Sequence, residues 1–255
     1  MNASLRAALV VSPVGPHLQT NIVTAVEMIG QAARAGANLV LLGEMALTGM
    51  VNNDDPAHDV PLGQSIPGPF SERLAGAATD LGIWLGFGLL EREGTCLYDT
   101  AVLLSPQGDV RLRYRRIQPQ WHGRHADPAV YCQGTELRQV ETDFGSFAFM
   151  VCGDLWDDSL CARMRELRPD WVLYLFERGF PGGSRDQARW ERDELPEYSR
   201  RVAGIGVPVL ATSYVCTEVF CEEADAFGGA MVFDRAGAVV AMQPLDQPGI
   251  LHWEA

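Results

Sequence analysis

Short stretches that are apolar at nearly every position constrain the fold of this chain more than any other feature. Residues 37–44 read ANLVLLGE and residues 146–151 read SFAFMV. A strand that is apolar on both sides has to be covered on both faces, as happens in a sheet that lies between other layers. Such stretches alternate along the chain with helix-like segments. The sequence therefore predicts an α/β protein in which two sheets lie inside layers of helices.

The order of the predicted elements favours one domain over residues 1–255, because no internal repeat and no Pro/Gly/Ser-rich linker divides the chain. A long irregular segment, residues 118–135, is expected to be functional or mobile. Helices are expected over 20–35, 70–81, 157–168 and 186–205, the first of them capped by Thr20 or Asn21 and ended by Gly36. Strands are expected over 6–12, 37–44, 83–91, 97–105, 110–117, 137–143, 146–151, 170–177, 207–214, 228–234 and 238–243.

The charge balance narrows the choice of partners. The chain has a formal net charge of -13 and an isoelectric point near 4.7, whereas binding to nucleic-acid phosphates needs clusters of Lys and Arg. We therefore expect neither a nucleic acid nor an anionic membrane surface as a partner. A run of about 18 apolar residues, which a membrane-spanning helix would need, does not occur in the sequence.

The cysteines and histidines are scattered. The six cysteines lack CxxC spacing and the five histidines lack a ligand pair at helical spacing, so neither a disulfide framework nor a metal site is expected. We expect a soluble cytoplasmic protein without a metal or another cofactor. The cysteines are Cys96, Cys132, Cys152, Cys161, Cys216 and Cys221.

One cysteine ends an apolar strand at a corner. Cys152 follows residues 146–151, a glycine comes next, and Asp154, Asp157 and Asp158 are interpreted as caps of the helix that follows. Backbone amides in such a turn favour negative charge, so a thiolate there is expected to have a lowered pKa and to act as a nucleophile. The alternative is that Cys152 is a small buried hydrophobic residue, as most unpaired cysteines are.

A cysteine hydrolase also needs a group that moves protons. Glu44 ends the apolar stretch 37–44 and precedes a loop, which places its carboxylate at the mouth of the sheet. Desolvation at such a position raises the pKa of a carboxyl toward the working range of a general base. The alternative is a solvated Glu at a strand end, which is the commoner case for a single residue.

Four segments, in this order, resemble the nitrilase superfamily of carbon-nitrogen hydrolases. GANLVLLGEMALTGM (36–50) resembles the strand that ends in a catalytic Glu, and LYDTAVLLSPQGDVRLRYRRIQP (97–119) resembles the hairpin that carries a catalytic Lys. FMVCGDLWDD (149–158) resembles the nucleophile elbow, and AFGGAMVFDRAGAVVA (226–241) resembles the C-terminal hairpin. The resemblance implies a four-layer α-β-β-α sandwich with a Glu, Lys and Cys triad at the strand ends.

The resemblance also implies a chemistry. The cysteine of the family attacks an amide or nitrile carbon, the Glu acts first as base and then as acid, and water releases the covalent intermediate. Cys152 corresponds to the nucleophile, Glu44 to the base and Gly153 to a donor of an oxyanion-binding amide. The phrases CGDLW and GEMALTG look most like the glutaminase-type and small amidase branches, so a small carboxamide or ω-amide is the expected substrate.

The catalytic lysine of the family has no counterpart here. Arg116 occupies its position in the run YRRI, and the chain contains 20 arginines and no lysine. A guanidinium can donate hydrogen bonds to an oxyanion, but it is longer, planar and always charged, so the exchange is not conservative. Three explanations stay open: a coding bias toward arginine, replacement by engineering, and a family member that binds ligands without hydrolysing them.

Two further positions depart from the family pattern. Gly43 stands where the family usually has Pro before the base, and it is expected to loosen the local backbone. The second, supporting Glu of the family is also missing. Asp127 is the candidate nearest to its place, although Asp127 could simply cap the turn that Pro128 enforces.

The remaining candidates surround the expected pocket. Phe176 and Glu177 correspond to a position at which family members contact the substrate. Arg178 could meet an acidic group of the substrate or pair with Glu177. Trp121 could line the entrance or serve as packing. The resemblance further implies a homodimer, or a higher homo-oligomer, that packs through the helices beside the nucleophile.

Two functions are consistent with these observations. The first is cysteine-dependent hydrolysis of a carbon-nitrogen bond in a small-molecule amide. The second is a catalytically silent nitrilase-like protein that acts as a ligand-binding or regulatory subunit, because Arg116 replaces the lysine.

Overall fold

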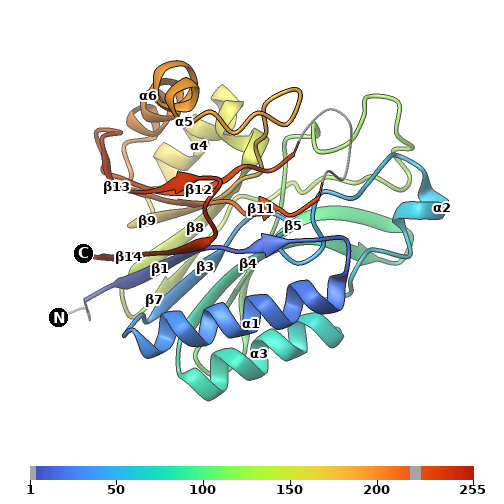
Figure 1. Cartoon of the computed structure of the whole chain (residues 1–255), viewed down its shortest axis with the longest axis horizontal. Coiled ribbons are helices and arrows are strands. Elements are labelled where there is room, and N and C mark those ends of the chain that lie inside the picture. The colour runs from blue at the N-terminus through green and yellow to red at the C-terminus, as the bar shows by residue number, and fades with distance from the viewer. Residues whose placement is uncertain (1–3, 219–224) are drawn as a thin grey trace.

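The computed structural model of the chain describes residues 4–218 and 225–255, so Cys221 lies outside the described residues. Two six-stranded sheets lie face to face, and helices cover the outer side of each (Figure 1). The strand order is β14-β1-β3-β4-β5-β6 in the first sheet and β13-β12-β10-β9-β8-β7 in the second. The predicted α-β-β-α sandwich is confirmed.

The elements have the following bounds. The first sheet consists of β1 (Arg6–Val11), β3 (Leu39–Leu42), β4 (Trp84–Glu93), β5 (Cys96–Leu104), β6 (Val110–Arg115) and β14 (Gly249–Glu254). The second consists of β7 (Gln139–Thr142), β8 (Gly145–Val151), β9 (Trp171–Leu175), β10 (Val209–Thr212), β12 (Gly228–Phe233) and β13 (Val239–Leu245). A small pair contains β2 (Pro13–Val14) and β11 (Val215–Cys216).

The helices fall into two layers. The first sheet is covered by α1 (Leu18–Arg34) and α3 (Pro69–Leu81), and the second by α4 (Asp158–Leu167) and α6 (Leu195–Ile205) (Figure 1). Shorter helical segments are α2 (Pro56–Asp59), α5 (Gln187–Arg189), a 3₁₀ turn at Cys152–Trp156 and a π turn at Trp190–Glu194. None of the helices in the described part of the chain is long and apolar enough to cross a bilayer.

The apolar strands divide their side chains between two cores. In β3, Leu39 and Leu41 pack between the sheets, whereas Val40 and Leu42 pack against α1 and α3. In β8, Phe149 lies between the sheets and its neighbour Met150 packs under the second helix layer. Alternate residues of one strand therefore face different layers, which is why these strands are apolar at every position.

Parallel pairing brings the functional strand ends to one edge. β3 pairs in parallel with β1 and β4, and β9 pairs in parallel with β8 and β10. The residues that follow β3, β8 and β9 therefore leave the two sheets at their carboxyl ends, where binding sites of parallel sheets usually form.

Two predictions about the elements are wrong. No strand is predicted after 238–243, yet β14 pairs antiparallel with β1 over its whole length. Neither Thr20 nor Asn21 caps α1: His17 is the N-cap residue, and the buried amide of Asn21 donates to the carbonyl oxygens of Gly15 and Leu47. The predicted helical region 186–205 is confirmed, because α5, the π turn and α6 follow one another from Gln187 to Ile205.

Gly43 marks a point where the two sheets nearly touch. A Cβ atom at this position would lie 2.8 to 3.1 Å from backbone atoms of Ser213, which follows β10 in the opposite sheet. Real Cβ atoms do not approach that closely, so the position excludes a side chain because of packing. The structure thus gives Gly43 a packing role, because the glycine permits close contact between the sheets; the expectation that it loosens the backbone stays a prediction.

Replacement of Gly43 by alanine tests this contact. We expect Gly43→Ala to lower the free energy of unfolding by about 3 kcal/mol, because the new methyl group meets a backbone that cannot move aside. Gly76 is the matched control, since it lies exposed in α3 with open space around it. Gly76→Ala should stabilise the protein by about 0.5 to 1 kcal/mol. Urea unfolding of both variants measures the difference, and equal midpoints would contradict the close approach.

Candidate active site

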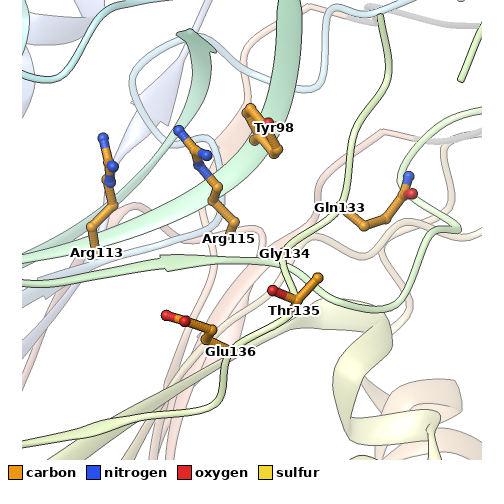
Figure 2. Close-up of a pocket in the computed structure, with 7 residues that line it drawn as sticks. All are labelled: Tyr98, Arg113, Arg115, Gln133, Gly134, Thr135 and Glu136. Atoms are coloured by element: carbon orange, nitrogen blue, oxygen red, sulfur yellow. The ribbon is translucent and has the colours of Figure 1, made fainter. Parts of the chain in front are cut away.

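A polar pocket of about 360 Å³ lies over β5 and β6 and contains two arginines (Figure 2). Leu112 and Tyr114 of β6 face the core between the sheets, so Arg113 and Arg115 project from the other face. Both arginines pair with Glu91 and Glu93, which neutralises the charge that an anion would need. This pocket therefore offers little for chemistry. Its lining residues are Tyr98, Arg113, Arg115, Gln133, Gly134, Thr135 and Glu136.

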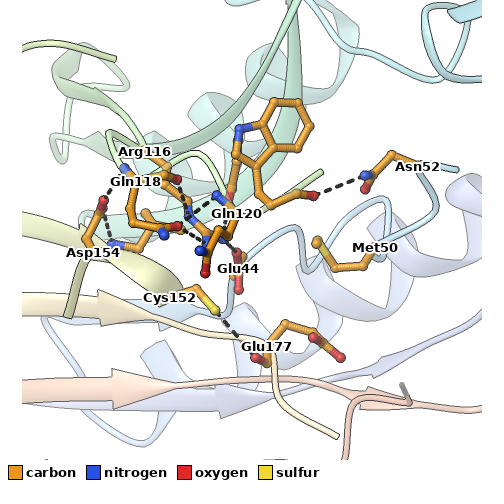
Figure 3. A network of polar contacts seen from close by, with 12 residues as sticks. Glu44, Met50, Asn52, Arg116, Gln118, Gln120, Cys152, Asp154 and Glu177 are labelled. Carbon is orange, nitrogen blue, oxygen red and sulfur yellow. Dashed lines mark hydrogen bonds and ion pairs between the residues drawn. The ribbon is translucent and has the colours of Figure 1, made fainter. Parts of the chain in front are cut away.

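A buried group of charged side chains at the edge of the first sheet is a better candidate (Figure 3). Glu44 follows β3, Asp99 lies in β5 and Arg116 follows β6. Nη1 of Arg116 donates to Oε1 of Glu44 at 3.0 Å and to Oδ2 of Asp99 at 3.4 Å. Their exposed fractions are 0% for Glu44, 1% for Asp99 and 3% for Arg116. The predicted general base and the arginine at the lysine position thus lie in direct contact.

Burial sets the proton affinities in this group. Burial first, and then the charges of Cys152 and Asp99, hold the pKa of the Glu44 carboxyl well above its usual range, against the opposing effect of Arg116. Burial also raises the pKa of Asp99, while its hydrogen bonds with Glu44 and Arg116 oppose the rise. One oxygen of each acid, Oε2 of Glu44 and Oδ1 of Asp99, has no partner among the described residues. Glu44 therefore holds its proton to a higher pH than an exposed carboxyl, which suits a group that accepts and returns a proton.

Cys152 lies at a strained corner beside this group (Figure 3). Its φ of 41° falls in the left-handed region, which costs a residue with a side chain about 1 kcal/mol or more. The hydroxyl of Tyr174 donates to the Cys152 carbonyl at 2.9 Å and helps to hold the corner. The thiol donates to the carbonyl oxygen of Glu177 at 3.6 Å. Figure 3 shows the sulfur directed toward the space between Glu44 and Glu177.

The thiol differs from the prediction in its acidity. Burial raises the pKa of Cys152, and the positive charge of Arg116 offsets this only in part. The expected lowering by turn amides is therefore wrong, because desolvation outweighs it. A protonated thiol in the resting protein needs a neighbouring base, and Glu44 is near enough to sense its charge.

Asp154 has a different role from the one predicted. It does not cap α4, which Asp157 caps through the amides of Ser159 and Leu160. The carboxylate of Asp154 is fully buried and accepts hydrogen bonds from the Tyr114 hydroxyl at 2.7 Å and from the Val151 amide at 2.9 Å. Tyr114 belongs to the first sheet and Val151 to the second. Asp154 therefore joins the two sheets directly below the corner that carries Cys152.

Gly153 leaves room for the guanidinium. A Cβ atom on Gly153 would overlap Nη2 of Arg116 and would lie 2.5 Å from Oε1 of Gln118. The backbone that follows Cys152 is thus in contact with Arg116, although the two come from different sheets. The role of the Gly153 amide as an oxyanion donor stays a prediction.

Glu177 lies after β9 and next to the thiol. Burial raises the pKa of its carboxyl to about 7, the charge of Asp225 adds to this, and Arg178 opposes it. Arg178 itself pairs with Glu194 at 2.6 Å, so the alternative pairing of Arg178 with Glu177 is wrong. The sulfur contacts the backbone carbonyl of Glu177 and not its carboxyl, so the contact of Glu177 with a substrate stays a prediction.

Two aromatic candidates pack away from solvent. Phe176 is fully buried and stacks with Tyr174 and Trp190 in the core under the second helix layer. Trp121 is 3% exposed and packs with Met45 and Tyr131, so packing is its observed role and it does not line an open entrance. The Trp121 carbonyl oxygen accepts a hydrogen bond from Asn52 at 3.1 Å. The side chains of Phe176 and Trp121 therefore belong to the apolar packing of the protein.

The prediction for a supporting acid is wrong. Asp127 is exposed and caps its own turn, since its Oδ1 accepts from the amide of Ala129 at 2.9 Å. Asp99 is instead the second acid beside Arg116. The available signal was an aspartate within the otherwise apolar stretch LYDTAVLLS, because an unpaired charge is rarely buried in a strand.

The arrangement fits nucleophilic chemistry on a carbonyl-like carbon. It combines a thiol, a carboxyl of raised pKa and a cationic hydrogen-bond donor within one buried group. The described residues contain no cluster of three or more His, Cys, Asp or Glu side chains that could hold a metal ion.

Comparisons with known proteins agree with this chemistry. The family model for carbon-nitrogen hydrolases matches residues 6–254. An aliphatic nitrilase from Sinorhizobium fredii (strain HH103) is 27% identical over 265 aligned positions, covering 92% of this chain and 81% of the nitrilase.

Solved structures show the same fold. A carbon-nitrogen hydrolase from Helicobacter pylori G27 superposes with a TM-score of 0.82 at 18% identity, covering 98% of this chain and 88% of the other. A variant of the amidase from Nesterenkonia sp. AN1 has a TM-score of 0.79 at 20% identity and covers 98% of this chain and 90% of the other. That variant carries the acetamide moiety of fluoroacetamide covalently on its active-site cysteine.

The raised pKa of Glu177 predicts a pH-dependent cost to stability. A folded-state pKa of about 7, against a usual value of 4.5, means that the folded chain keeps a proton that the unfolded chain releases between these values. Stability therefore falls as the pH rises from 4.5 to 7. Glu177→Gln mimics the protonated form and should raise the free energy of unfolding by about 2 kcal/mol at pH 8, with little effect at pH 4.5.

Urea unfolding at both pH values measures this effect. Glu166→Gln is the control, because Glu166 is exposed on α4, and it should change stability little at either pH. A gain for Glu177→Gln that is equal at pH 4.5 and pH 8 would contradict the titration.

Proposed function

This chain belongs to the carbon-nitrogen hydrolase family, and we propose that it hydrolyses a small carboxamide or ω-amide with Cys152 as the nucleophile. The observation that carries the proposal is the contact between the Glu44 carboxyl and the Arg116 guanidinium, both buried, beside the Cys152 thiol. The likeness to the Nesterenkonia amidase favours an amide. The aliphatic nitrilase among the relatives makes a nitrile the second substrate to test.

The proposed reaction has two halves. Glu44 accepts the proton of the Cys152 thiol while the sulfur attacks the amide carbon, and the carbonyl oxygen becomes an oxyanion. Arg116 and the amide of Gly153 donate hydrogen bonds to that oxyanion. Glu44 then gives the proton to the leaving amine or ammonia, and the carbon-nitrogen bond breaks. In the second half Glu44 takes a proton from water, which attacks the thioester, and returns that proton to the sulfur as the acid departs.

The position of Asp99 supports different roles for Asp99 and Glu44. Arg116 contacts both of them, at 3.0 Å and 3.4 Å. Two acids in one buried group seldom ionise together, so environments that separate their pKa values assign them different roles. We assign Asp99 to the partial neutralisation and orientation of Arg116, and Glu44 to proton transfer.

A homodimer that packs through the helices beside Cys152 is part of the proposal. The 3₁₀ turn that begins at Cys152 ends in Trp156, which leads into α4 and is one of the large apolar side chains exposed on the described surface, at 37%. Burial of such a side chain would favour association through this face.

The silent alternative also has an observation in its favour. Arg116 is already engaged by two carboxyls, which weakens the positive charge that remains for an oxyanion. A family member with this arrangement could bind an amide and leave it intact.

Ammonia release from short aliphatic amides tests the proposal. We expect turnover by the parent protein, none by Cys152→Ala, and a loss in kcat of about 10³-fold for Glu44→Gln, because the base is removed while the shape is kept. The acid limb of the kcat/KM profile should lie above the usual range for a carboxyl, since activity falls as Glu44 gains its proton and the pKa of Glu44 is raised.

Mass spectrometry of the parent after treatment with fluoroacetamide completes this test. The hydrolase predicts one acetamide adduct, on Cys152. Uniform slow labelling of all cysteines, together with no ammonia release, would support the silent alternative.

Arg116→Lys tests whether the site is adapted to arginine. Lysine is shorter and has three donors on a single nitrogen, so it cannot make all the contacts that Arg116 makes on two sides. We expect kcat to fall by about tenfold or more. Arg73→Lys on the exposed side of α3 is the control and should leave kcat unchanged. A large gain in kcat for Arg116→Lys would instead identify a site weakened by drift.

A further inference from the structure

The hydrogen bonds of Arg116 show how its guanidinium is held. Nη1 donates to Glu44 and to Asp99, Nε donates to the carbonyl oxygen of Gln118 at 3.0 Å, and Nη2 donates to Oε1 of Gln118 at 3.0 Å. A guanidinium has five N–H groups. These four bonds leave one N–H of Nη2 without a partner among the described residues. Gln118 therefore supplies half of the contacts that orient the group.

Gln118 is itself anchored to the corner that carries the nucleophile. Its amide donates to Oδ1 of Asp154 at 2.9 Å, and Asp154 lies two residues after Cys152. Its Oε1 also accepts from the amide of Gln120 at 2.8 Å, which fixes the side-chain amide in place (Figure 3). Gln118, which makes two contacts with Arg116, is thus held by the same backbone segment that positions the sulfur of Cys152.

Because Gly153 has no side chain, Arg116 and Gln118 can lie against its backbone. A Cβ atom there would overlap Nη2 of Arg116 and press on Oε1 of Gln118. Nη2 consequently lies against the backbone of the residue that follows the nucleophile. The N–H that remains on Nη2 is therefore near the place where an oxyanion forms when Cys152 attacks a carbonyl carbon.

We propose that Gln118 is a positioning residue that holds Arg116 so that one N–H of Nη2 is directed at the oxyanion. The inference rests on the proposed function. Arginine has a long, flexible stem, and the two carboxyls contact only Nη1, which leaves rotation of the rest of the group unconstrained. Gln118 provides the second point of attachment. Because its oxygens are neutral, it does so without cancelling more of the positive charge.

A double-substitution experiment separates positioning from simple support of the loop. Gln118→Ala and Gln118→Met, which keeps the length of the side chain, are each made in the parent and in Arg116→Lys. In the parent we expect kcat to fall by about 10- to 100-fold with KM nearly unchanged, because the oxyanion exists only in the transition state. In Arg116→Lys the further loss should be less than about threefold, since a lysine has no Nη2 to orient.

The matched control in this experiment is Gln120→Ala, which keeps the backbone amide that contacts Gln118. It should retain the parent kcat. Equal losses for the Gln118 variants in both backgrounds would overturn the proposal and assign Gln118 to the stability of the loop.

The rate at which iodoacetamide alkylates Cys152, followed by peptide mass spectrometry across pH, gives a readout that needs no amide turnover. Arg116 lowers the pKa of Cys152, so a displaced guanidinium should move the profile to higher pH and slow alkylation at pH 8 by about threefold or more. Gln118→Met should show this shift and Gln120→Ala should not.

The two proposals fail in different ways in this assay. A parent-like profile for Gln118→Met would overturn the positioning role whether or not amides are hydrolysed. A shifted profile in a protein that releases no ammonia would support the positioning of Arg116 and would overturn the proposed hydrolysis.

Discussion

The burial of one arginine between two acids is the interaction on which the site depends. Arg116, Glu44 and Asp99 are almost wholly removed from water, and each comes from a different segment of the first sheet. Removing such charges from water costs several kcal/mol per ion, and the cost is offset only where geometry and hydrogen bonding are good. The order β3-β4-β5-β6 provides that geometry, because it places the three segments at one edge. The raised pKa of the Glu44 carboxyl results from this burial.

The second requirement is that the sheet with the charged group keeps its position relative to the sheet that carries Cys152. Asp154 meets it by accepting hydrogen bonds from Tyr114 on one side and from Val151 on the other. Gly43 allows the backbones of the two sheets to approach at the same edge. The buried hydrogen bonds of Asp154 and the close approach at Gly43 therefore both fix how the two sheets pack. The apolar core between the sheets surrounds these contacts.

The layers of the fold and part of the candidate site could be predicted from the sequence. Strands such as 37–44 and 146–151 were recognisable because both of their faces are covered, and the positions of Glu44 and Cys152 followed from where those strands end. Arg116 was identified by the resemblance of the run YRRI to the family pattern. β14 escaped prediction because it is an edge strand with a mixed pattern, whose pairing with β1 joins opposite ends of the chain. Asp99 and Asp154 acquire their roles through contacts between segments far apart in sequence. The acidity of Cys152 was misjudged because local turn geometry reveals nothing about how deeply a sulfur is buried.

The candidate catalytic side chains are divided between the two six-stranded sheets. Glu44 and Arg116 follow strands of the first sheet and Cys152 follows a strand of the second. The two sheets are linked at few points, among them the β2–β11 pair and the hydrogen bonds of Asp154. The relative position of the sulfur and the Glu44 carboxyl is therefore set by the packing between the sheets and by these few links, and not by the strand pairing within either sheet.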